Sequence, residues 1–151
     1  MKWQRILVPH DFSPSANLAA ALARDEAKAH GGGVMLLHVV DLSPAYGPET
    51  TLIVANDGGT PIGMREYAIR SATAHLQDLA ERLEADGLEI STFVRVGKPV
   101  DEILRFCREH EADVIVMGTH GRTGLAHLIA GSVAERIVRG SSIPVMTIRH
   151  E

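Results

Sequence analysis

The chain has 151 residues, of which 45% are hydrophobic, 23% charged and only 4% aromatic. That length suits one domain, residues 1–151, and the formal net charge of −4 argues against binding to nucleic acid or to an anionic membrane. The sequence contains no apolar stretch that is long enough to cross a bilayer, and its single cysteine, Cys107, excludes an internal disulfide and is typical of a cytoplasmic protein.

Short apolar runs bounded by glycine, proline or polar residues predict five β-strands. These runs are Arg5–Val8, Val34–Val40, Ile90–Val96, Val114–Met117 and Pro144–Arg149. The first, second and fourth are continuously apolar, which is typical of strands that helices cover on both faces. The third includes polar residues and the fifth begins with a proline, so we expect these two at the edges of the sheet.

Four helices are predicted between the strands. The first is rich in alanine, with Ser13 as its N-cap and Pro14 at its first position, and it ends at the glycines 31–33. The second has an apolar face at helical spacing and stops near Gly87; that face consists of Ile69, Ala72, Leu76, Leu79 and Leu83. Pro99 begins the third, in which Cys107 takes a core position rather than that of a redox sensor. The fourth spans Ser132–Arg139, with Gly140 as its C-cap.

Strands that alternate with helices predict an α/β fold: one doubly wound, Rossmann-like open parallel sheet of five strands, with four helices. Numbered along the chain, the strands take the order 3-2-1-4-5. The connections then leave in opposite directions from strands one and four, and ligands of such sheets bind at that switch point. Residues 8–12 and 117–121 lie there. From Asp41 to Gly63 the sequence is rich in glycine and proline without sustained periodicity, so we expect a long loop.

Glycines with a distinctive spacing follow the fourth strand. Gly118, Gly121 and Gly131 precede Ser132, where the last helix begins. Glycine allows a backbone to approach a ligand closely, and a helix N-terminus favours anions, so this segment predicts a cradle for phosphate. Two alternatives need no ligand: Ser132 and Glu135 fit a capping box, and the glycines are also common in strand ends and turns. Neither a P-loop nor a dinucleotide fingerprint is present.

The segments ILVPHDFSPSA and GTHGRTGLAHLIAGSVAERIVRGSSIPVMTIR resemble the N-terminal and C-terminal signatures of the universal stress protein family. The resemblance covers nearly the whole chain and leaves out only Leu42–Pro61. The nucleotide-binding branch of that family carries the motif G-x2-G-x9-G-[ST]. This chain matches the motif at Gly118, Gly121, Gly131 and Ser132.

The resemblance implies that the chain binds ATP, ADP or AMP. Asp11 and the backbone of Val39 would contact adenosine, with Pro9 and Met117 as pocket walls. The ribose and the phosphates would be held by Gly118, Gly121, Gly131, Ser132 and the amide of Val133. His120 and Arg122 are further candidates for phosphate contacts, with exposure to solvent as the alternative. Asp11 also has another interpretation, as a cap for the helix that begins near Pro14.

Eight histidines suggest a metal site, but none of them shows metal-ligand spacing. We therefore expect Mg²⁺ to arrive with the nucleotide and assign no metal ligand in the protein. His10 departs from the small residue that is common in the family, and it would either crowd the pocket or add a contact to phosphate or metal.

These observations predict a regulatory stress-response protein whose conformation or choice of protein partner depends on ATP. No catalytic residue is assigned, so any hydrolysis should be slow. The alternative is an ATP-using enzyme of the adenine-nucleotide hydrolase-like fold, which would need an acid or base such as Glu49 or Asp57. A third interpretation is a structural dimer without a ligand. We also expect a homodimer through the strand at residues 144–149, whose edge is unguarded after Pro144.

Overall fold

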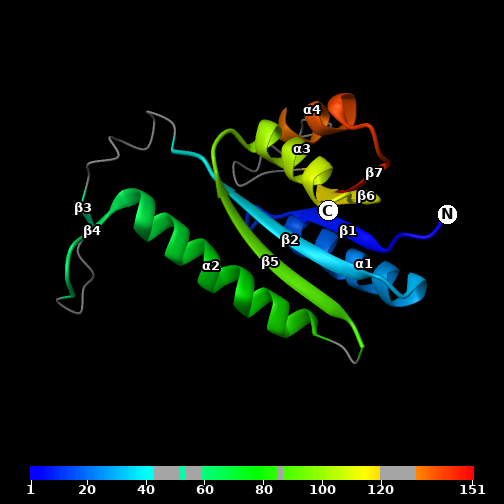
Figure 1. Cartoon of the computed structure of the whole chain (residues 1–151), viewed down its shortest axis with the longest axis horizontal. Coiled ribbons are helices and arrows are strands. Elements are labelled where there is room, and N and C mark those ends of the chain that lie inside the picture. The colour runs from blue at the N-terminus through cyan, green and yellow to red at the C-terminus, as the bar shows by residue number, and fades with distance from the viewer. Residues whose placement is uncertain (43–51, 54–58, 85–86, 120–131) are drawn as a thin grey trace.

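A computed structural model of the chain describes residues 1–42, 52–53, 59–84, 87–119 and 132–151. Five of its strands form a parallel sheet in the order β5-β2-β1-β6-β7 (Figure 1). Their bounds are β1 Arg5–Pro9, β2 Gly33–Val40, β5 Glu89–Val96, β6 Val114–Gly118 and β7 Val145–Ile148. This order is the predicted 3-2-1-4-5, so the fold class is confirmed. The pattern of apolar and polar residues was enough to assign three strands to the centre of the sheet and two to its edges.

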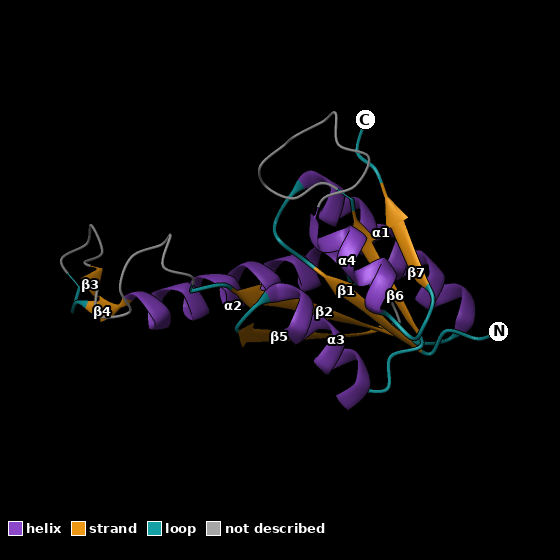
Figure 2. Ribbon diagram, turned by 90° about the horizontal axis from the view of Figure 1, so that it is seen from above, coloured by secondary structure: helices purple, strands orange, loops and turns teal. Residues whose placement is uncertain are grey.

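Four helices cover the two faces of this sheet (Figure 2). Their bounds are α1 Pro14–His30, α2 Met64–Leu83, α3 Pro99–Glu109 and α4 Ser132–Gly140. One core cluster joins α1 and α2 to the sheet, and a second joins α3 and α4 to its other face. Strand β1 supplies both clusters because its side chains alternate: Ile6 and Val8 belong to the first and Leu7 to the second, all with 0% exposure.

The ends of α1 follow directly from its sequence. The Ser13 hydroxyl accepts a hydrogen bond from the Ala16 amide at 3.3 Å, and Pro14 occupies the first turn, where its missing N–H costs nothing. At the other end Gly31 has φ 69°, the left-handed conformation that commonly closes a helix. Both predicted ends of this helix are confirmed. They matter for the site because only the short turn of residues 10–13 separates the end of β1 from the start of α1.

A small second sheet lies within the stretch predicted to be a loop. Strand β3, Leu52–Ile53, pairs antiparallel with β4, Ile62–Gly63, beside the first residues of α2 (Figure 1). The prediction of a loop throughout 41–63 was therefore wrong for the residues of β3 and β4. Two residues per strand are too few to show an alternating pattern, which is why the sequence did not reveal them.

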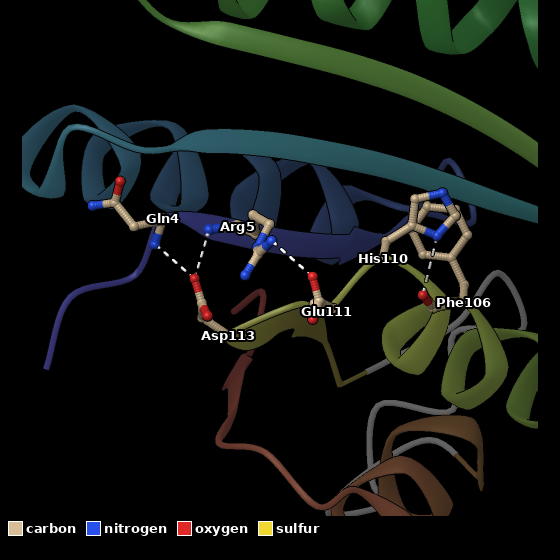
Figure 3. A network of polar contacts seen from close by, with 6 residues as sticks. All are labelled: Gln4, Arg5, Phe106, His110, Glu111 and Asp113. Carbon is tan, nitrogen blue, oxygen red and sulfur yellow. Dashed lines mark hydrogen bonds and ion pairs between the residues drawn. The ribbon is translucent and has the colours of Figure 1, made fainter.

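Asp113 stabilises the amino-terminal ends of β1 and β6. Its Oδ2 atom accepts hydrogen bonds from the Gln4 and Arg5 amides, both at 2.8 Å, and the Arg5 guanidinium pairs with Glu111 at 3.2 Å (Figure 3). A carboxylate that accepts two backbone N–H groups holds both strands in register. The protein's own side chains thus stabilise the amino-terminal ends of these strands, whereas the ligand is expected at their carboxyl ends.

Candidate functional site

The predicted switch point lies between β1 and β6. Strand β1 continues through α1 to β2 on one side, whereas β6 continues to β7 on the other. The carboxyl ends of all five parallel strands meet at this edge: Pro9 pairs with Leu37, and Gly118 pairs with Ile148. The sheet therefore places residues 8–12 and residues 117–119 on adjacent strands, at the position where open α/β sheets bind their ligands.

The two predicted wall residues, Pro9 and Met117, and Val39, which was predicted to contact adenosine through its backbone, come from three neighbouring strands. Val39 lies on β2 and Met117 on β6, and both pack in the α3–α4 core. Pro9 ends β1 between them, and alternation after Leu7 assigns its side chain to the same face. The structure thus brings Pro9, Val39 and Met117 together on the face of the sheet that α3 and α4 cover. An apolar wall of this kind suits the flat surface of a nucleobase.

Asp11 lies in the turn after β1 and is half-buried. One of its carboxylate oxygens, Oδ1, accepts a hydrogen bond from the Ser13 amide at 3.0 Å. The helix cap itself is Ser13, so the interpretation of Asp11 as the cap of α1 is wrong. Within the part of the chain that the structure describes, the other carboxylate oxygen has no hydrogen-bond partner. It is available to accept from a hydroxyl or an amino group.

Gly118 ends β6 where α1 packs against it. A Cβ atom at this position would lie 2.8 Å from the backbone carbon of Ser15, closer than side chains approach backbone. Glycine is therefore required here by the packing of α1, whether or not a ligand is present. Sequence spacing alone did not reveal this reason, because Ser15 is far away along the chain.

The rest of the glycine motif lies largely outside the described residues. His120, Gly121, Arg122 and Gly131 fall in the stretch that the structure does not describe, as do the alternative catalytic candidates Glu49 and Asp57. Ser132 begins α4, and Val133 follows it in the first turn, half-buried against the α3–α4 core. The motif therefore runs from the end of a strand to the start of a helix, the frame that the phosphate cradle requires.

The structure places His10 on the α1–α2 face of the sheet, with Val8, where it lines a cleft with residues of α1 and α2. It therefore does not crowd the predicted wall residues, and its contact with phosphate or metal stays a prediction. Its side chain is only 4% exposed. The Nδ1 atom accepts from the Phe12 amide and Nε2 bonds the Asn17 side chain, both at 3.0 Å. Burial lowers the pKa of His10 to about 4, so the ring is neutral at physiological pH. The alternation Ile6, Val8, His10 was the sequence signal that could have assigned this face.

Sequence reasoning also missed the aromatic group around Phe12. The Phe12 ring lies 4.6 Å from the His38 ring and 5.2 Å from the His75 ring, measured between centroids. These residues come from the turn after β1, from β2 and from α2. Sequence alone could not bring them together, because the path of α2 across the sheet decides which of its residues meet Phe12.

Comparisons with known proteins agree with this architecture. The model of the universal stress protein family matches residues 2–149. Universal stress protein MJ0531 of Methanocaldococcus jannaschii is 32% identical over 147 residues, which cover 97% of this chain and 82% of that protein. Universal stress protein MJ0577 of the same organism is 26% identical, and the comparison covers 99% of this chain and 96% of that protein.

Solved structures show the same fold. The structure of MJ0577 superposes with a TM-score of 0.83 at 26% identity, covering 100% of this chain and 99% of that one. A universal stress protein from Archaeoglobus fulgidus in complex with dAMP superposes with a TM-score of 0.67 at 22% identity, covering 98% of this chain and 99% of that one. With the family model spanning nearly every residue, this chain belongs to the universal stress protein family.

Proposed function

We propose that this protein binds an adenine nucleotide, ATP foremost, in the crevice between the ends of β1 and β6, and that it acts as a regulatory stress-response module. The observation that carries the proposal is the meeting of Pro9, Val39 and Met117 on one face at the switch point, beside Asp11. The intact glycine spacing supports it, and so does the dAMP complex of the A. fulgidus relative.

Each residue has a distinct part in this proposal. The backbone of Val39 meets the edge of the adenine, and Pro9 and Met117 cover its faces. Asp11 accepts hydrogen bonds from the adenosine through the oxygen that Ser13 leaves available. The phosphates lie against backbone N–H groups at Gly121, Gly131, Ser132 and Val133, where the partial positive charge of the α4 N-terminus favours them.

We propose that Mg²⁺ binds together with the nucleotide and not at a metal site of the protein's own side chains. Among the described residues, no group of three or more histidine, cysteine or acidic side chains could hold a metal ion. Phosphates and water are therefore the expected ligands of the cation. His120 and Arg122 are proposed as additional phosphate contacts, and the protein's own output is a change of conformation or of partner rather than rapid turnover.

The direct test compares ATP with GTP. The backbone at Val39 should discriminate, because guanine presents a reversed pattern of donors and acceptors at the corresponding edge. At about 100 times its Kd, ATP should stabilise the protein by about 2.7 kcal/mol and raise Tm by roughly 5–10 °C. GTP should have little effect. Equal shifts, or no shift with either nucleotide, would contradict the proposal.

A variant pair separates the phosphate cradle from general stability. Gly131→Val should abolish ATP binding measured by calorimetry while the protein stays folded, because the side chain would fill the position of the phosphate. Gly63→Val is the matched control, since a Cβ at Gly63 meets nothing within 4 Å. Normal ATP binding by Gly131→Val would place the cradle elsewhere.

We also propose that two copies pair through β7. This strand ends the described sheet, with β6 on one side of it. The Ile115 amide donates to the Pro144 carbonyl, and the Thr119 amide donates to the Ile148 carbonyl. The backbone N–H and C=O groups of residues 144, 146 and 148 therefore point toward β6. The backbone groups of Val145 and Thr147 then face outward, as an edge that a second copy would cover.

Thr147→Pro tests this dimer without touching the β6 ladder. Proline removes one outward N–H, so light scattering should find a monomer where the wild type is a dimer. The alternative of lysine at Met146 and Ile148 is less clean, because both side chains pack against the α1–α2 core. A dimer unaffected by Thr147→Pro would place the interface on another surface.

A cytoplasmic location is the last part of the proposal. The single cysteine, Cys107, is a reduced core residue, only 7% exposed, and burial raises the pKa of its thiol. None of the helices, searched over the described residues, has the length and apolar character needed to span a membrane.

A further inference from the structure

A cleft opens between α1 and α2, on the face of the sheet away from Val39 and Met117. Its volume is about 200 Å³, and residues from three parts of the chain line it: His10, Phe12, Asn17, His75, Leu79 and Arg82. His10 forms its buried floor, whereas Asn17, His75 and Arg82 are exposed along its walls. The proposed nucleotide site uses none of these side chains, so the cleft is a separate feature of the fold.

Hydrogen bonding at the floor determines what Asn17 offers to the cleft. The Phe12 amide donates to Nδ1 of His10, so the proton of the neutral ring is on Nε2. That N–H donates to Oδ1 of Asn17 at 3.0 Å. The oxygen of the Asn17 amide is therefore occupied. Its NH₂ group, with two donors, has no hydrogen-bond partner among the described residues and can donate to a ligand. The Phe12 backbone N–H fixes the tautomer of His10 and thereby leaves Asn17 as a hydrogen-bond donor in the cleft.

Arg82 adds a positive charge to the same cleft. Its Nε atom pairs with Oδ2 of Asp78, one helical turn earlier, at 3.2 Å. Within the described part of the chain no hydrogen-bond partner occupies its two terminal nitrogens. A guanidinium with free terminal N–H groups suits a carboxylate, and the Asn17 amide provides another donor nearby. The polar groups that converge here are thus mainly donors.

Apolar surface completes the cleft. Leu79 is buried, and Phe12 is held by its backbone hydrogen bond to His10 with a φ of 65°, which is uncommon for a bulky residue. Residues in such conformations gather at ligand-binding positions. The Phe12 ring contacts the rings of His10, His38 and His75, which fix its orientation. Phe12 lines the cleft together with the donors.

We propose that this cleft binds a small aromatic carboxylate, with the ring against Phe12 and Leu79 and the carboxylate between Arg82 and the Asn17 amide. The size agrees, because a cavity of about 150 Å³ accommodates benzene, and this one has room for a ring and one carboxylate. The site would make the protein responsive to a second small molecule, bound on the face opposite to the nucleotide.

Benzoate is the probe, and benzamide is its neutral control. Titration of the ¹⁵N-labelled full chain should shift the amide signals of Asn17, His75 and Arg82, and benzoate should bind about tenfold more tightly than benzamide, as one charge-assisted interaction predicts. Equal affinity of the two probes would overturn the proposed ligand class. Absence of shifts at these three residues would overturn the site.

Three variants locate the charge. Arg82→Met should weaken benzoate binding about tenfold, and Asp78→Asn should strengthen it about two- to fivefold by freeing the guanidinium from its partner. Arg70→Met is the matched control, because Arg70 lies on the same helix and pairs with Glu66, also four residues earlier. The proposal fails if Arg70→Met weakens binding as much as Arg82→Met, or if Asp78→Asn weakens it.

Discussion

The end of β1 sends successive side chains to opposite faces of the sheet, and the two faces differ in how their polar groups are used. On the α1–α2 face, His10 is buried and both of its ring nitrogens have partners within the protein. On the α3–α4 face, Pro9 joins Val39 and Met117. In the turn that follows, Asp11 has one carboxylate oxygen without a hydrogen-bond partner among the described residues. On the first face, the end of β1 stabilises the start of α1 through His10. The second face is the one on which we propose that the nucleotide binds.

The largest effect is expected where α1 meets β6. Gly118→Val should lower the free energy of unfolding by about 3 kcal/mol or more, because the new side chain would collide with the backbone of Ser15. Urea unfolding measures the loss. By comparison, Gly131→Val should lose nucleotide and keep its stability. If Gly118→Val is as stable as the wild type, the close packing of α1 on β6 is wrong.

The next effect isolates the α1–α2 face through pH. The pKa of His10 is about 4 in the folded protein, compared with 6.5 as its ordinary value. Between these two pH values the His10 ring is protonated in the unfolded chain but neutral in the folded one. Stability should therefore fall as pH drops from about 6.5 to about 4, by roughly 2–3 kcal/mol between pH 7 and about pH 4.5. Urea midpoints for the wild type and His10→Gln measure it. A variant with an equally steep pH dependence would show that His10 is not the cause.

A smaller pair of effects distinguishes Asp11 from Ser13. Asp11→Ala should weaken ATP binding about 10- to 100-fold, because it removes the acceptor that is proposed to meet adenosine. Ser13→Ala should cost about 1 kcal/mol of stability through the lost cap and leave ATP affinity unchanged. Calorimetry and urea unfolding together test both residues. If Asp11→Ala changes stability alone, its role is only to brace the turn.

Much of this fold could be predicted from sequence because its signals are local. Apolar runs identified all five strands of the parallel sheet, and the contrast between continuous and mixed patterns set their order. Ser13, Pro14 and Gly31 define the ends of α1 through contacts with residues a few positions away. Tertiary packing did not override these preferences, so the predictions agree with the structure.

The features that sequence did not reveal depend on tertiary packing or on the orientation of a single ring. The requirement for glycine at 118 comes from Ser15, which is distant along the chain, whereas the donor character of Asn17 depends on the tautomer of His10, only seven residues away. The cleft exists only because α2 passes beside Phe12. The face of His10 was an exception, since counting alternate residues from Ile6 would have assigned it. For the candidate site, the sequence predicted correctly which strand ends lie at the switch point. The role of Gly121 and Gly131 in the phosphate cradle stays a prediction, because these residues lie outside the described part of the chain.

The most direct test of the division between the two faces is an ATP titration of the ¹⁵N-labelled protein, followed residue by residue. The largest shifts of amide signals should occur at Asp11, Val39, Gly118 and Val133, which lie at the ends of β1, β2 and β6 and at the start of α4. Asn17, His75 and Arg82, in the cleft on the other face, should change little. Shifts concentrated at these three cleft residues, with Val39 and Gly118 unchanged, would contradict the account.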